Sequence, residues 1–147
     1  MRLSQFLLIG LVLLLAACSS KSGPNDEAET ISYGSREDSQ GSVTVKVTPL
    51  NLGIAQDTLN FEVVMDTHSV ELSMDLAAIA ALSNDRGDRV QAVDWPVGSG
   101  HHYEGVLSFP SSNSAGKPLL EDATRVVLVL TGLDAAERRF EWDINAG

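Results

Sequence analysis

The sequence is poor in cysteine and in basic residues. Its 147 residues include one cysteine, so no disulfide can form within the chain. Ten lysines and arginines stand against 20 aspartates and glutamates, which gives a net charge of −10 at pH 7. Because such a surface repels phosphate backbones, we expect no nucleic-acid binding. The charge instead favours cations or basic partners.

Catalytic motifs are also missing. The sequence contains no Gly-x-Ser-x-Gly elbow, no His-Glu-x-x-His pair and no glycine-rich phosphate loop. Carboxylates are plentiful, but none stands in a recognisable acid/base pair. We therefore predict that the protein is not an enzyme.

One long apolar run is present, FLLIGLVLLLAA at residues 6–17, and Arg2 is the only charged residue before Lys21. As a helix this run would span roughly 18 Å, against roughly 30 Å of bilayer hydrocarbon. A basic start followed by a short apolar core and small residues is typical of a secretory signal peptide. We therefore predict a signal peptide over residues 1–17.

The run ends in Leu15-Ala16-Ala17-Cys18, which resembles the lipobox of bacterial lipoproteins. The resemblance implies cleavage before Cys18, a diacylglycerol thioether on its sulfur, and a lipid-anchored, extracytoplasmic protein whose partner is the bilayer. Ser19 in place of an aspartate favours the outer membrane if the source is Gram-negative. Removal of residues 1–17 would leave nine basic and 20 acidic residues, a net charge of −11. The alternative is a free or buried thiol behind an ordinary cleaved signal.

Residues 19–41 are rich in Ser, Gly, Asp and Glu, and Ile31 and Tyr33 are their only large apolar side chains. Such a segment buries too little apolar surface to offset the entropy lost on ordering. We therefore predict a lipidated cysteine and flexible tether over residues 18–41, followed by one folded domain over residues 42–147.

Apolar and polar residues alternate through much of this domain. The alternation predicts strands over 43–47, 61–65, 70–76 and 140–144, and the uniformly apolar 126–130 predicts a central strand. Asp75 can cap a short helical turn that leads into a further strand over 78–82. Turn signals separate these segments at residues 51–53, 84–88, 98–100, 111–118 and 131–137. The pattern predicts an all-β, immunoglobulin-like antiparallel β-sandwich of seven or eight short strands.

Two stretches, FEVVMDTHSVELSMDL at 61–76 and WPVGSGHHYEGVLSFP at 95–110, also resemble a largely uncharacterised family of prokaryotic β-sandwich domains. The resemblance implies the sandwich fold and carries no activity.

Histidines offer a candidate metal site. Imidazole suits copper and zinc, and thioethers suit Cu(I). Strand alternation opposes a site built from neighbouring histidines, because it places His101 and Tyr103 toward the core and His102 and Glu104 toward water. The candidate ligands are His68, His101 and His102, with Asp66 and Glu104 as weaker ones.

A second candidate site is apolar. Trp95, Pro96 and Tyr103 can form a patch that faces a partner, with core or rim aromatics as the alternative. The tripeptide Arg86-Gly87-Asp88 is read as hairpin-turn chemistry rather than as a recognition motif.

These observations predict a membrane-anchored lipoprotein that presents a non-catalytic β-sandwich binding module in the cell envelope, with another envelope protein as a possible partner. No cofactor is expected beyond the covalent lipid on Cys18. The alternatives are a copper- or zinc-handling lipoprotein that uses the histidine loops, and a purely structural envelope component.

Overall fold

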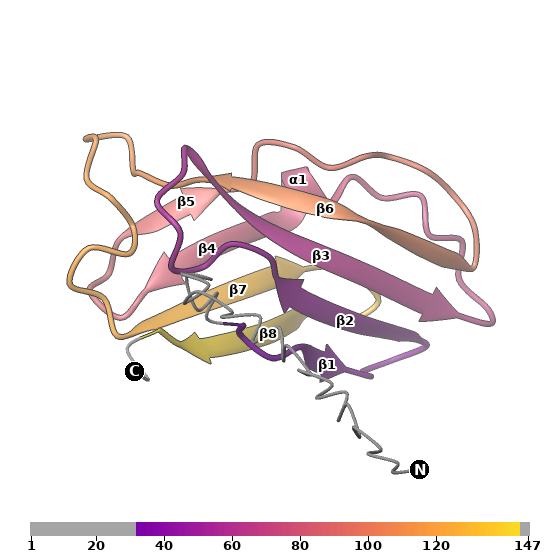
Figure 1. Ribbon diagram of the computed structural model, residues 1–147. Coiled ribbons are helices and arrows are strands. Elements are labelled where there is room, and N and C mark those ends of the chain that lie inside the picture. The colour runs from indigo at the N-terminus through magenta and orange to yellow at the C-terminus, as the bar shows by residue number, and fades with distance from the viewer. Residues whose placement is uncertain (1–31, 145–147) are drawn as a thin grey trace, which may run out of the picture. The chain divides into compact units, whose positions relative to one another are not determined.

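A computed structural model describes residues 32–144; the predicted signal peptide and Cys18 lie outside them. Two four-stranded antiparallel sheets pack face to face (Figure 1). The predicted all-β sandwich is therefore confirmed. Within the described residues, no helix is long and apolar enough to cross a membrane.

The first sheet has the strand order β1-β2-β3-β6. Its strands are β1 (Arg36–Asp38), β2 (Val43–Pro49), β3 (Thr58–Thr67) and β6 (His102–Pro110). The second sheet has the order β5-β4-β7-β8, with β5 (Arg89–Gln91), β4 (Ala80–Asn84), β7 (Arg125–Thr131) and β8 (Glu137–Asp143). The strands predicted at 43–47, 61–65, 126–130 and 140–144 thus correspond to β2, β3, β7 and β8.

The core lies between the two sheets, because alternation buries every second side chain of β2, β3 and β8. Strands β4 and β7 bury consecutive residues. Phe61 of β3 joins the two layers: its ring lies 5.7 Å from that of Phe109 in β6 and 5.4 Å from that of Trp142 in β8. All three side chains are almost completely buried. Their burial makes the interior of the sandwich a single apolar core.

The segment after β3 differs from the prediction. Residues 70–75 form no strand, and a single helical turn follows as α1 (Leu76–Ile79), capped by the Asp75 carboxylate, which accepts a hydrogen bond from the amide of Ala77. Leu72 and Leu76 are buried, whereas Val70 and Met74 are only partly so. The two buried residues, Leu72 and Leu76, are four positions apart, which is the spacing of one helical face. An alternating pattern also places apolar residues four positions apart, so it fits both structures. The predicted turn at Asp75 is present, and the strand that follows begins at Ala80.

The predicted tether boundary is wrong, because residues 33–40 belong to the sandwich. Strand β1 pairs with β2, from Arg36 opposite Val47 to Asp38 opposite Val45. Its far side closes on β8 through side-chain to backbone hydrogen bonds. The side chains of Tyr33, Arg36 and Gln40 donate to the backbone carbonyls of Ile144, Glu141 and Glu137, respectively. In the other direction, the indole N–H of Trp142 donates to the carbonyl of Gly34. These bonds connect polar groups, so the hydrophobic pattern carries no sign of them.

The two ends of the sandwich differ in the residues that they hold. The entry end holds Tyr33, the second described residue, together with Gly53 and Pro110. An added Cβ at Gly53 would lie 3.5 Å from the Tyr33 hydroxyl. The histidine end holds Val43, Thr67 and His102, at the opposite ends of β2, β3 and β6.

Candidate interaction surface

Strand β6 forms one edge of the first sheet, and its outer side is closed near both ends. Ser108 exchanges backbone hydrogen bonds with the segment after β5: its carbonyl accepts from Val93 and its amide donates to Asp94. At the other end the carbonyl of Gly100 accepts from the amide of Leu72. The backbone groups of Gly100 and Ser108 therefore point away from β3.

Between these two points the edge is open. Backbone groups of alternate residues in a strand point to the same side, so His102, Glu104 and Val106 also direct their N–H and C=O groups outward. Strand β3 occupies the inner side of β6. Among residues 32–144 no backbone hydrogen bond is formed on the outer side at these positions. Three consecutive outward-facing residues thus present six backbone polar groups to solvent.

An aromatic cluster lies beneath the open edge. The rings of Trp95 and Tyr103 are 5.7 Å apart, and the Tyr103 hydroxyl donates to the carbonyl of Pro96. A Cβ at Gly105 would lie 2.6 Å from the ring of Pro96, so only glycine lets this segment pack against β6. The three residues predicted as a patch are therefore in contact with one another.

Their exposure divides the cluster into a buried and an accessible part. Trp95 is 5% exposed and belongs to the core, whereas Pro96 is exposed and Val97 is 61% exposed. The indole N–H of Trp95 has no hydrogen-bond partner among the described residues. The accessible apolar groups beside the open part of the edge therefore include Pro96 and Val97, and neither Val97 nor Gly105 was singled out from the sequence.

The exposed face of β6 carries His102, Glu104 and the 40% exposed Val106. His102 Nδ1 lies 2.5 Å from a carboxylate oxygen of Asp66, directly across from it in β3. This hydrogen bond, with the charges of Asp66 and Glu104, raises the pKa of His102 above its ordinary value of 6.5. Glu104 itself is exposed and has no ion-pair partner among residues 32–144.

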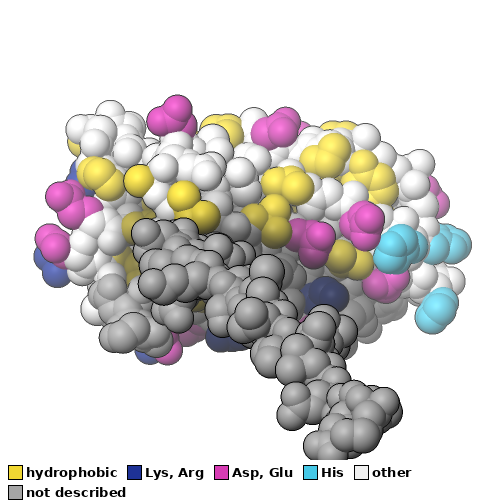
Figure 2. Space-filling view, in the orientation of Figure 1, with side chains coloured by type: hydrophobic (Ala, Val, Ile, Leu, Met, Phe, Trp, Pro, Cys, Tyr) yellow, Lys and Arg dark blue, Asp and Glu magenta, His cyan; other side chains and the backbone are white. Residues whose placement is uncertain are grey.

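Histidine side chains gather at one end of the visible face (Figure 2). His101 and His68 are close in the fold, because the carbonyl of His101 accepts from the amide of Thr67. Within the described part of the chain, however, no three His, Cys, Asp or Glu side chains lie close enough to hold a metal ion. The structure brings together His102 and Asp66 of the five candidate ligands.

The prediction that His101 faces the core is wrong. His101 precedes the first residue of β6 and is exposed, as are His68, His102 and Glu104. Alternation holds only where an opposing layer covers the inner face of the strand. Tyr103, the next residue on that face, is already half-buried.

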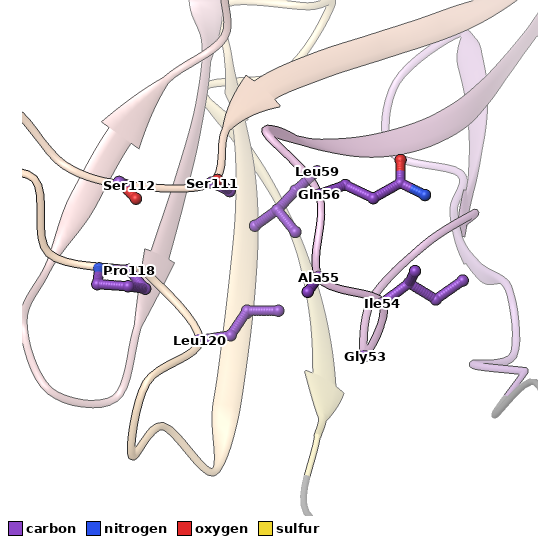
Figure 3. A pocket seen from close by; sticks show the side chains of 9 residues that line it. All are labelled: Gly53, Ile54, Ala55, Gln56, Leu59, Ser111, Ser112, Pro118 and Leu120. Atoms are coloured by element: carbon purple, nitrogen blue, oxygen red, sulfur yellow. The ribbon is translucent and has the colours of Figure 1, made fainter.

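A concavity lies at the entry end (Figure 3). The loop after β2 faces the loop after β6 across a hollow of about 400 Å³. Its lining is mostly apolar and consists of Gly53, Ile54, Ala55, Gln56, Leu59, Ser111, Ser112, Pro118 and Leu120. No charged side chain lines it.

The Arg86-Gly87-Asp88 tripeptide lies in the turn between β4 and β5, as predicted. Asp88 accepts hydrogen bonds from Asn84 and Asn113 and pairs with Lys117 at 2.7 Å. Gly87 has a φ of 89°, which favours glycine. The carboxylate of Asp88 therefore holds two loops together.

Comparison of the chain with protein-family models found no match, and neither did comparison with curated proteins or with solved structures.

Proposed function

We propose that the protein is a lipid-anchored lipoprotein of the cell envelope and that its β-sandwich is a non-catalytic binding module. The observation that carries the proposal is Cys18, which stands directly behind the apolar run of residues 6–17. The anchor would be the acylated N-terminal cysteine, and no metal or other cofactor is part of the proposal.

The geometry of the first described residues supports this arrangement. Fourteen residues separate Cys18 from Tyr33, and even a fully extended chain of that length reaches no further than about 50 Å. The chain joins the sandwich at the entry end, where Tyr33 donates a hydrogen bond to the carbonyl of Ile144. An anchor at Cys18 would thus hold the sandwich by its entry end.

The open edge of β6 supports a binding role for the module. Its outward residues His102 and Glu104 lie toward the histidine end, away from the point where the chain enters. Exposed Val97 and Pro96 flank this edge with apolar surface. A module held by its entry end would therefore present this edge to other molecules of the envelope.

Substitution of the cysteine tests the anchor. The wild-type chain should partition with membranes and into detergent as the processed form, and Cys18→Ser should accumulate unprocessed. Ser19→Ala, which leaves the cysteine intact, is the matched control and should be processed normally. Efficient maturation of Cys18→Ser into a freely soluble protein would refute the proposal.

A further inference from the structure

We propose that the open edge of β6 binds an extended segment of another protein, of five or six residues with alternating basic and apolar side chains, which adds a strand to the first sheet. This inference names the partner of the binding module proposed above and rests on that proposal. The carrying observation is the edge at His102, Glu104 and Val106, which lies open between closed positions at Gly100 and Ser108.

The backbone sets the length and conformation of the segment. Three outward residues at alternate positions offer three donors and three acceptors over about five residues of strand. An added strand satisfies such groups with its own backbone, and its side chains supply specificity. The bonds at Asp94 and Leu72 set the two limits of this site.

Side chains on the exposed face set the charge of the segment. An added residue opposite Glu104 would lie beside a carboxylate with no ion-pair partner among residues 32–144. Glu62 and Asp66 of β3 lie on the same face, opposite Val106 and His102. Opposite charges across a strand pair are favourable, so lysine or arginine is expected at the exposed positions.

The inner positions of the segment would be apolar. Residues that alternate with the basic ones would point toward the side of the sheet on which Pro96 packs against Gly105. Pro96 and Val97 there are exposed. Apolar side chains at these positions would cover them.

A second copy of this chain is a poorer occupant. In an antiparallel pairing of two β6 edges centred on Glu104, this residue would face its own counterpart. Like charges directly opposite each other destabilise a strand pair. The net charge of −10 adds repulsion between copies and favours a basic partner.

Other edges of the sandwich are closed or short. Arg36 and Gln40 donate to the carbonyls of Glu141 and Glu137 on the outer side of β8. Strands β1 and β5 have three residues each. Strand β6, with nine residues, is the long edge of the described part that remains open at its centre.

Peptide binding to the full chain in detergent micelles tests the inference. The probe is an acetylated, amidated peptide of three Lys-Val repeats, and a peptide of three Glu-Val repeats is the matched control. Fluorescence anisotropy should show binding of the Lys-Val peptide and at least about tenfold weaker binding of the Glu-Val peptide. Amide NMR signals of residues 102–106 should shift, and their hydrogen exchange should slow.

Variants of the edge separate strand addition from charge alone. Val106→Pro removes an outward N–H that β3 does not use, so the sheet should keep its circular dichroism while binding weakens by at least about tenfold. Val106→Thr keeps this donor and should bind within about twofold of wild type. Glu104→Lys should weaken binding by about tenfold. In an antiparallel pair the lysines opposite the outward residues of β6 direct their backbone N–H groups toward that strand. A Lys-Val peptide with N-methylated lysines should therefore not bind, whereas N-methylated valines, whose N–H groups would point away from β6, should be tolerated.

Three results would overturn the inference. These are equal binding of the Lys-Val and Glu-Val peptides, undiminished binding to Val106→Pro, and dimers of the chain cross-linked through residues 102–106. Cys18→Ser in the same micelles should bind the peptide like wild type. Efficient maturation of Cys18→Ser into a soluble protein therefore contradicts the proposed function, whereas failure of the wild-type chain to bind the peptide contradicts the edge site.

Discussion

The guanidinium of Arg138 is buried in the seam between β1 and β8, and its Nη1 lies 2.6 Å from Oδ1 of Asp38, 100 residues earlier in the chain. The same group donates to the backbone carbonyls of Asp38, Gln40 and Leu133. One buried side chain thus holds the segment that leads toward the N-terminus against the second sheet. A buried charge needs such partners, because leaving it unpaired is costly.

Asp38→Asn should destabilise the sandwich by about 1–3 kcal/mol at pH 7, because it replaces a charged acceptor of Arg138 with a neutral one. Burial raises the pKa of Asp38, but hydrogen bonds from Gln40 and the charge of Arg138 lower it below the ordinary value of 3.8 overall. Asp38 therefore contributes stability above about pH 4 that is lost as the pH falls through its folded-state pKa. The free energies of unfolding of the two proteins, measured in urea, should differ at pH 7, and the difference should shrink as the pH falls below 3.8; a constant difference would contradict the ion pair.

A deletion that stops before residue 32 should leave the stability of the sandwich unchanged, whereas one that extends past it should lower the stability. Removal of residues 19–31 should leave the melting temperature within about 2 °C of wild type, because no described contact is lost. Removal of residues 19–41 should cost about 3 kcal/mol or more, because it takes away β1 and the partners of Arg138. Thermal unfolding of both deletions checks this. Equal melting temperatures would show that the contacts between β1 and β8 do not stabilise the fold.

His102 should titrate above its ordinary pKa of 6.5, because the Asp66 carboxylate stabilises its charged form. The pair therefore contributes stability below about pH 6.5 that is lost as the pH rises through the folded-state pKa. Asp66→Asn should bring the NMR titration midpoint of His102 back toward 6.5, and Glu104→Gln should lower it by less. An unchanged midpoint in Asp66→Asn would rule out the contact.

Two substitutions of Trp95 distinguish the contribution of its packing from that of its indole N–H. Trp95→Ala should destabilise the protein by about 3–5 kcal/mol, because it empties a buried aromatic site against Tyr103. Trp95→Phe should cost much less, because the indole N–H that it removes has no partner among the described residues. Chemical denaturation of both variants checks the order; similar losses would indicate that the N–H makes an essential bond.

Strands with apolar alternation could be predicted from the sequence, because one buried face leaves a local pattern. Strands β2, β3 and β8 show it clearly. Strand β7 is predicted by its uniformly apolar run instead. Residues 70–76 show the same alternation but bury Leu72 and Leu76 in a loop and a helical turn. A period of two includes a period of four, so the pattern alone could not choose between them.

Strand β1 and the open edge could not be predicted, because they depend on distant groups. The sequence Arg36-Glu37-Asp38 has no apolar side chain, and its place is set by β2 and by Arg138. Trp95, Pro96 and Tyr103 are in contact, but Trp95 lies in the core, as the alternative to a partner-facing patch had it. The openness of β6 beside them depends on which loops bond its outer side. The exposure of His101 likewise depends on where β6 begins and on whether an opposing layer covers its inner face at that point.

Mass spectrometry of the N-terminal peptide, from the chain purified out of membranes, tests the central claim most directly. The proposal predicts a mature protein that begins at Cys18 and carries a diacylglyceryl group on its sulfur, with residues 1–17 absent. A mature chain with a free, unmodified thiol at Cys18, or one that retains residues 1–17, would contradict it.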